Sequence, residues 1–281
     1  MSDASPAPIR SRFARELTTI VAAPVVVAII GWAPVWAYVA LITVALSLAL
    51  WEFIALGARK GYPVQQVISI LLMLLLVWTF LDREISVEIG VFAILLAIPA
   101  SYVFAKSPLE EALPATAVCV LATLYVGMLG GALIRLRTDF EGVGPQLVFF
   151  LLITVWAADA GAYYVGRKFG KHRLSPRVSP KKSVEGLVGG VATSLLAAAV
   201  VHFTFFPELP LLHAIGAAFI LSIMGVIGDL AESMWKRSAA VKDSGALIPG
   251  HGGFLDRVDS ILFTAPILYA YWYLLNNPWS P

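Results

Sequence analysis

The sequence is divided into long apolar runs that are separated by short polar segments. About 20 apolar residues in a helix cross the hydrocarbon core of a bilayer, because each residue adds about 1.5 Å. Strands of a membrane β-barrel would be shorter and would alternate in polarity. We therefore expect an all-α, polytopic integral membrane protein with about nine transmembrane helices. The expected spans are residues 16–32, 34–56, 63–81, 88–105, 113–134, 146–166, 186–206, 210–230 and 259–275.

The composition supports lipid as the main solvent of this chain. Hydrophobic residues make up 59% of the sequence and charged residues 14%, whereas soluble domains carry roughly 25% charged residues. The only cysteine, Cys119, lies inside an apolar run, so no intrachain disulfide is possible. We expect Cys119 to be a small core residue.

The first run follows Arg10, Arg12 and Arg15, as in a secretory signal peptide. The stretch after Gly31 is bulky and has no clear small-residue cleavage site before the next span. We therefore interpret this run as a retained first helix, and removal as a signal peptide is the alternative.

The positive charges predict the orientation of the chain. With the N-terminus in the cytoplasm and nine crossings, all but three of the 20 Lys and Arg residues fall on the cytoplasmic side. The exceptions are Arg83, Arg135 and Arg137. The same assignment puts the two longest polar loops, 167–185 and 231–258, on the cytoplasmic side and the C-terminus in the periplasm.

These loops suggest a division of the chain into two regions. Residues 1–140 would form an N-terminal transmembrane region with five spans and no catalytic motif. Residues 141–281 would form the catalytic region, with four spans and an active site at the cytoplasmic side. In the first region we interpret Glu52 as an interfacial carboxylate near Arg59 and Lys60, and a functional role is the alternative.

Asp159 lies late in the sixth expected span, where Gly161 and Gly166 would let another backbone come close. Its carboxylate could also simply reach the interface. The loop that follows is strongly basic, and on its own this charge could serve only topology and the binding of anionic lipid headgroups.

The segment SPKKSVEG is more specific than its charge alone. Ser179 and Pro180 are expected to set a turn, and Lys181 and Lys182 supply cations. Ser183 would open the next helix. Cations and free backbone N–H groups at a helix start suit a phosphate ligand.

Residues 228–259 carry the densest polar pattern. Four side chains have the i, i+4, i+7, i+8 spacing that places them on one helix face. They are Asp229, Ser233, Lys236 and Arg237. The polar and glycine residues that follow are Lys242, Asp243, His251, Gly252, Gly253, Asp256, Arg257 and Asp259. Carboxylates bind a hard divalent cation, basic groups neutralise phosphate, and glycines let the backbone approach a nucleotide, so this segment predicts a polyphosphate site.

The string S-x-x-K-R-x4-K-D-x-G-x2-I-P-G-H-G-G-x-x-D-R-x-D, over residues 233–259, resembles the pattern of the phosphatidate cytidylyltransferases, or CDP-diacylglycerol synthases. It matches at every fixed position. The upstream segments DAGAYYVGRKFGK and SPKKSVEG are also similar to the family. The close resemblance covers about residues 155–265.

The resemblance implies that CTP and phosphatidic acid react to give CDP-diacylglycerol and pyrophosphate in phospholipid biosynthesis. It also implies a requirement for Mg²⁺, an association with a second, monovalent cation (K⁺), and a homodimer. The metal-binding carboxylates of the family correspond to Asp229 and Asp256, and Lys236 to a basic residue that faces the substrate phosphates.

From these observations we expect three catalytic residues, Asp229, Lys236 and Asp256. The expected metal ligands are Asp229, Asp256, Asp259 and Asp159. The expected substrate-binding residues are Ser179, Lys181, Lys182, Ser233, Arg237, Lys242, Asp243, His251, Gly252, Gly253 and Arg257.

Two other functions stay open at the level of sequence. One is a CTP-dependent kinase of a lipid alcohol, which would transfer the γ-phosphate. The other is a transporter, which would place polar groups near mid-membrane in paired halves, whereas these charges gather at one face of the second half. We expect location in a bacterial inner membrane, in contact with membrane lipids and without a nucleic-acid partner.

Overall fold

The protein is described here in a computed structural model, which places residues 23–82, 84–245 and 252–277. Within these residues, six helices are long and apolar enough to cross a membrane. They are α2 (Val35–Arg59), α5 (Leu109–Thr138), α6 (Gly144–Phe169), α7 (Val184–Thr204), α8 (Leu211–Ser238) and α9 (Leu255–Asn276). Two shorter apolar helices are α3 (Gln66–Leu81) and α4 (Val87–Val103). The expectation of an all-α integral membrane protein is confirmed, and the number of nine crossings stays a prediction.

Helices α2 to α9 coincide with the second to ninth expected spans. Proline precedes three of them, because its fixed φ and missing N–H suit the start of a helix. These prolines are Pro34, Pro108 and Pro210. Helix α7 starts after Ser183, whose hydroxyl accepts a hydrogen bond from the Gly186 N–H at 3.1 Å, as the sequence predicted.

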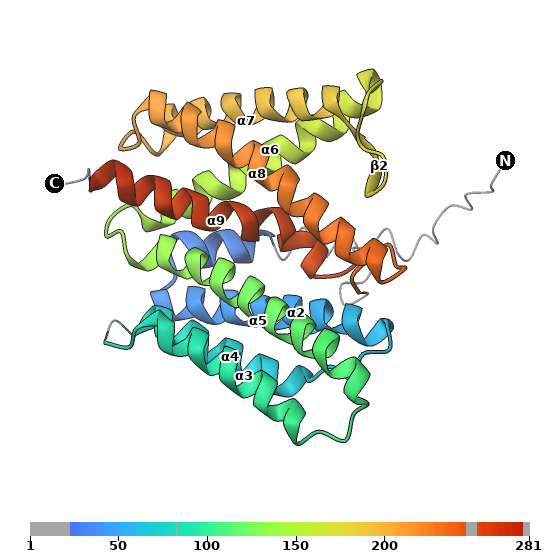
Figure 1. The fold of residues 1–281 in the computed structure, drawn as a ribbon. Coiled ribbons are helices and arrows are strands. Elements are labelled where there is room, and N and C mark those ends of the chain that lie inside the picture. Colours follow the sequence, from blue (N-terminus) through green and yellow to red (C-terminus); the bar gives the residue numbers. More distant parts are fainter. Residues whose placement is uncertain (1–22, 83, 246–251, 278–281) are drawn as a thin grey trace.

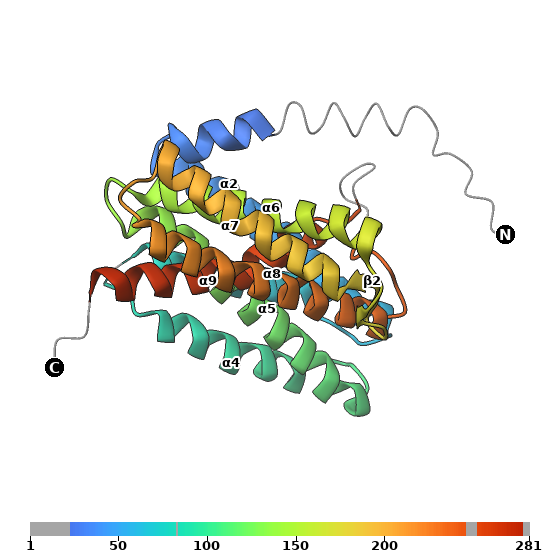
Figure 2. The ribbon, with the colours of Figure 1, turned by 90° about the horizontal axis from the view of Figure 1, so that it is seen from above.

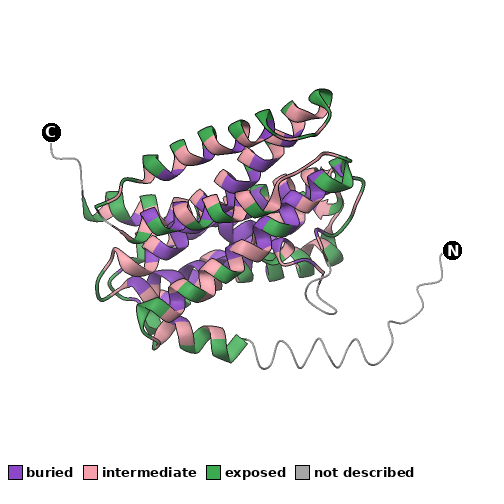
Figure 3. Ribbon diagram, turned by 90° about the horizontal axis from the view of Figure 1, so that it is seen from below, coloured by how far each residue is buried: buried purple, intermediate pink, exposed green. Residues whose placement is uncertain are grey.

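Helix α9 runs through the middle of the molecule (Figure 1). Helices α6, α7 and α8 lie on one side of it, and α2 to α5 lie on the other. Figure 2 shows the same bundle from above, with most helix axes running in similar directions. Buried residues concentrate in the centre of the bundle, and exposed residues lie on its outside (Figure 3). Many of the exposed side chains are large and apolar, such as Trp36, Phe92 and Phe203, which suits an outer surface in contact with lipid.

Helices α6 and α7 pack closely through glycine. A Cβ atom at Gly161 would lie 2.8 Å from the carbonyl oxygen of Gly189, and one at Gly166 would lie 3.4 Å from the Cα of Gly186. The close backbone approach predicted at Gly161 and Gly166 is therefore confirmed. It brings the C-terminal end of α6 beside the N-terminal end of α7.

A short hairpin connects these two helices. Strand β1 (Arg173–Ser175) pairs antiparallel with β2 (Ser179–Ser183). The prediction of a turn at Ser179 and Pro180 was wrong, because the turn lies at residues 176–178 and these two residues begin β2. A proline is tolerated at the first residues of an edge strand, where its missing N–H breaks no ladder.

Candidate active site

Acidic and basic side chains from α6, β2, α8 and α9 gather at one end of the bundle. The Nζ atom of Lys182, on β2, lies 2.5 Å from Oδ2 of Asp229, on α8. The Ser233 hydroxyl, one turn further along α8, donates to Oδ1 of Asp229 at 3.3 Å. The hairpin and α8 are thus joined through a carboxylate and a lysine that the sequence placed in separate motifs.

Lys236 forms the second centre of this cluster. Its side chain is buried, with 7% of the residue exposed, and it forms ion pairs with Glu232 and Asp256. The distance from Nζ to Oε1 of Glu232 is 3.2 Å. Glu232 belongs to α8 and Asp256 to α9, so Lys236 links the end of α8 to the start of α9.

The backbone before α9 also binds Asp256. Its Oδ2 accepts hydrogen bonds from the Ser244 N–H and the Gly253 N–H, each at 3.1 Å, and it lies 3.1 Å from the Ser244 hydroxyl. Both carboxylate oxygens are therefore occupied by donors, and the side chain is fixed in orientation.

Further carboxylates connect the two centres. Asp259 interacts electrostatically with Glu232 and with Asp229. Asp159, which is exposed on α6, interacts electrostatically with Asp259, Asp229 and Lys182. In the described part of the chain, no hydrogen bond or ion pair joins Asp229 directly to Asp256.

The other predicted substrate-binding residues lie around this cluster or apart from it. Lys181, Lys242, Asp243 and Arg257 are exposed, and Ser179 is half-buried. Arg237 does not enter the cluster with Lys236. Its guanidinium donates to the carbonyl oxygens of Val178 and Val241, at 3.4 and 3.0 Å. It therefore links the hairpin to the end of α8.

The glycine turn is placed only in part. His251 lies outside the described residues. Gly252 has a φ of +81°, which favours glycine, and Gly253 is buried against Ser244. The glycines therefore have a structural reason to be there in addition to the predicted approach of a nucleotide.

The donor set of this cluster suits a hard divalent cation, because carboxylate oxygens are its preferred ligands. Both carboxylate oxygens of Glu232 are buried without a hydrogen-bond partner. Among the described residues, however, no group of three or more His, Cys, Asp or Glu side chains is arranged to hold a metal ion. A cation that takes part of its coordination from a phosphate ligand and water needs fewer protein ligands than that.

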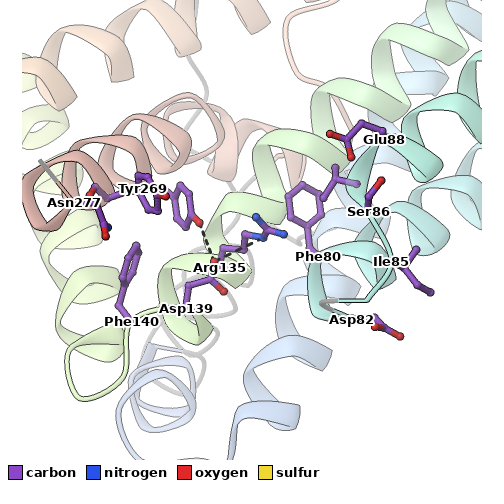
Figure 4. Close-up of a pocket in the computed structure, with 12 residues that line it drawn as sticks. Phe80, Asp82, Ile85, Ser86, Glu88, Arg135, Asp139, Phe140, Tyr269 and Asn277 are labelled. Atoms are coloured by element: carbon purple, nitrogen blue, oxygen red, sulfur yellow. Dashed lines mark hydrogen bonds and ion pairs between the residues drawn. The ribbon is translucent and has the colours of Figure 1, made fainter. Parts of the chain in front are cut away.

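A polar cavity of about 680 Å³ lies at the opposite end of α9 (Figure 4). Its lining includes Arg135 of α5 and Asp139, which directly follows that helix, and their side chains form an ion pair at 3.8 Å. Tyr269 also lines it, and its hydroxyl donates to Asp139 at 2.8 Å. The charged motif residues of the sequence all lie away from this cavity. We therefore place the candidate active site at the Lys182–Lys236 end.

Comparison with known proteins identifies the family of this chain. The model of the cytidylyltransferase family matches residues 13–275, which is almost the whole chain. The chain belongs to this family. A phosphatidate cytidylyltransferase of Bacillus subtilis is 35% identical over 234 residues, which cover 79% of this chain and 84% of that protein. One from Staphylococcus aureus strain COL is 43% identical over 153 residues, which cover 54% of this chain and 57% of that protein.

Two carboxylates of this chain were missed or misinterpreted from the sequence. Glu232 was missed, although its position four residues before Lys236 is the spacing of a helical ion pair. Glu52 was interpreted as an interfacial carboxylate, and this was wrong. It is buried, with 2% exposed, and it contacts Ser244 and Leu255. Apolar neighbours in α2 gave no sign of those distant partners.

Proposed function

We propose that this protein transfers the cytidylyl group of CTP to phosphatidic acid, which gives CDP-diacylglycerol and pyrophosphate in phospholipid biosynthesis. The observation that carries the proposal is the cluster in which Lys182 and Lys236 bind carboxylates of α8 and α9. All of its charged residues lie in the polar segments 159–171, 179–186 and 228–259, and a relative that covers 79% of this chain bears the name phosphatidate cytidylyltransferase.

The reaction needs little acid–base chemistry from the protein. An oxygen of the lipid phosphate is already anionic, and it attacks the α-phosphorus of CTP in line. A new P–O bond forms, the bond from the α-phosphorus to the bridging oxygen breaks, and pyrophosphate leaves with that electron pair. The main barrier is the approach of two anions, so positioning and charge neutralisation should supply most of the catalysis.

The residues of the cluster divide these tasks. Lys236, which is buried between two carboxylates, would bind a substrate phosphate at a fixed place. Lys182 is the more accessible of the two lysines and would bind phosphate of CTP or of the lipid headgroup. The exposed Lys181 and Lys242 would attract both anionic substrates to this end of the bundle.

Asp229 and Asp256 are the proposed ligands of Mg²⁺, with Asp259 and Asp159 beside them. When bound, the cation would neutralise phosphate oxygens and hold the triphosphate against the protein. The chain's part is to present the carboxylates in fixed positions, which for Asp256 is supported by its hydrogen bonds from the backbone N–H groups of Ser244 and Gly253. A second, monovalent cation, K⁺, is part of the same proposal.

The proposal includes a location in the bacterial inner membrane with nine crossings. The N-terminus and the active site would face the cytoplasm, where CTP is found, and the C-terminus would face the periplasm. Residues 1–140 would form a transmembrane region that supports the catalytic region, residues 141–281, and the protein would function as a homodimer.

The test is an assay of purified protein in detergent with CTP that carries label either in the cytosine ring or in the γ-phosphate. Ring label should enter the lipid product and γ-label should leave as pyrophosphate. Entry of γ-label into lipid would instead identify a kinase, and no labelled lipid at all would refute the proposal.

Variants then test the residue roles. Asp229→Asn and Asp256→Asn should each lower activity by at least about 10–100-fold, and added Mg²⁺ should restore part of it. Asp82→Asn, at the opposite end of the bundle, is the matched control and should leave activity unchanged. Near-normal activity of either variant at low Mg²⁺ would contradict the metal assignment.

A further inference from the structure

Glu52 connects the first half of the chain to the start of α9. It lies in the C-terminal half of α2, and 2% of it is exposed. Its Oε2 accepts a hydrogen bond from the Ser244 hydroxyl and another from the Leu255 N–H, both at 2.9 Å. These partners are 192 and 203 residues away in the sequence.

A carboxylate in this position is costly to keep. Its second oxygen, Oε1, has no hydrogen-bond partner, and in the described part of the chain no Lys or Arg forms an ion pair with Glu52. Burying a carboxylate away from water without a counter-charge is unfavourable. An apolar side chain would pack against the same helices at lower cost, so packing alone does not explain Glu52.

Two glycines leave room for this carboxylate. A Cβ atom at Gly253 would lie 2.6 Å from Oε2 of Glu52, and one at Gly245 would collide with its Oε1. Gly245 and Gly253 belong to the predicted polyphosphate motif, although neither contact involves a phosphate. The close approach to Glu52 therefore gives both motif glycines a reason within the protein itself.

The bonds of Glu52 converge on the surroundings of Asp256. The Ser244 hydroxyl lies within hydrogen-bonding distance of both carboxylates, at 2.9 Å from Glu52 and 3.1 Å from Asp256. Leu255, the other partner, directly precedes Asp256 in the chain. Glu52 thus holds one donor of Asp256 and the first residue of α9, from which the Asp256 side chain projects.

We propose that Glu52 is a positioning residue of the active site, which acts by holding Ser244 and Leu255 so that Asp256 keeps its orientation. Among the described residues no hydrogen bond joins Glu52 to Asp256, so the influence of Glu52 passes through Ser244 and Leu255. The expected loss of turnover rests on the proposed function. The expected loosening of the start of α9 rests on the hydrogen bonds alone.

The test compares two substitutions in the full-length protein. Glu52→Leu removes both acceptors, whereas Glu52→Gln keeps a side-chain oxygen that can accept the same two bonds. We expect kcat to fall by roughly 10–100-fold in Glu52→Leu, the range for groups that orient catalytic ligands. The KM for phosphatidic acid should stay within about twofold, and Glu52→Gln should retain most of the activity, because bonds to a neutral acceptor are weaker but still formed.

Hydrogen exchange measured by mass spectrometry gives a readout that does not depend on activity. In Glu52→Leu the Leu255 amide loses its acceptor, so the peptide that contains it should exchange on the order of tenfold faster. Peptides from α7 should be unchanged. The matched control is Thr79→Val in α3, which removes a buried hydroxyl that donates to the Leu76 carbonyl oxygen of the same helix, and it should alter neither readout.

Each outcome decides the inference. Faster exchange at Leu255 alone, together with the lower kcat, supports it. Faster exchange throughout the bundle would show that Glu52 serves general stability, and this would overturn the inference. Unchanged exchange at Leu255 would show that Glu52 does not stabilise the start of α9, and this would overturn it as well. If Glu52→Leu does not fold, Ser244→Ala removes one of the two links and should give the same local change to a smaller extent. Absence of labelled lipid with the wild-type protein would refute the proposed function, and the exchange result would still judge the role of Glu52.

Discussion

Replacement of Lys236 by methionine should destabilise the protein more than any other single change in the charged cluster. The side chain is buried and pairs with two carboxylates, Glu232 and Asp256. Methionine has a similar length and volume, so the packing of the chain is largely kept. What the substitution removes is the positive charge between two negative groups.

The size of the effect follows from the burial of these partners. Glu232 is 0% exposed, and within residues 23–82, 84–245 and 252–277 its oxygens have no hydrogen-bond donor. Among these residues Lys236 is the one positive group that forms an ion pair with it. Breaking a buried pair by removing one partner costs about 3–5 kcal/mol, because the other charge is left uncompensated. In a chain of about this size, 1 kcal/mol corresponds to roughly 2–4 °C, so the thermal midpoint should fall by roughly 6–20 °C.

The assay is thermal unfolding in detergent without substrate, followed by the fraction of protein that stays monodisperse. Arg237→Met, at the next position of α8, is the matched control, because this exposed arginine bonds only to carbonyl oxygens and its loss should cost less than about 1 kcal/mol. The most decisive comparison is with the double variant Lys236→Met with Glu232→Gln, in which the carboxylate left without a partner is replaced by a neutral amide. It should be more stable than Lys236→Met alone, and equal or lower stability would refute the reasoning.

Three further predictions concern single contacts. Lys182→Met should lower kcat/KM by at least about tenfold in steady-state kinetics. It should shift the thermal midpoint by less than about 3 °C, because its ion pair with Asp229 is partly exposed and such pairs contribute little stability. Gly253→Ala should lower both activity and thermal stability, because the added methyl would overlap a buried carboxylate; the same two assays should show both losses. Tyr269→Phe, at the opposite end of α9, should lose about 1 kcal/mol of stability with its bond to Asp139 and leave turnover unchanged, and altered turnover would contradict the placement of the site.

The helices could be predicted from the sequence because their signals are local. An apolar run of sufficient length predicts a membrane helix whatever its neighbours are, and α2 to α9 lie where such runs were found. The start of α7 could also be predicted, because a serine cap acts within one turn. The number of crossings needs a membrane boundary, which neither helix length nor hydropathy supplies for the short helices α3 and α4.

The site could be predicted only as far as its residues are neighbours along the chain. The motif segments contain Lys182, Asp229, Lys236 and Asp256, and the structure brings these together in two contacts. Glu52 could not be assigned in this way, since its partners lie about 200 residues further on and a carboxylate near a helix end is common at a membrane surface. The hairpin was missed for a different reason, because Ser-Pro is typical of turns and its pairing with β1 is not visible in the local sequence.

The balance of charge in the cluster bears on how it could receive its proposed substrates. The cluster contains two lysines, Lys182 and Lys236, and both are already paired with carboxylates. It contains five carboxyl groups, which belong to Asp159, Asp229, Glu232, Asp256 and Asp259. A triphosphate and a lipid phosphate that enter this site would meet more acidic groups than basic ones. Coulomb repulsion grows as water is excluded, so the protein's own charges would oppose the meeting of two anions. Cations brought in with the nucleotide would reverse this balance and would free the lysines to bind phosphate. The excess of carboxylates is therefore a physical reason to expect that the proposed reaction depends on metal ions, independent of any likeness to other proteins.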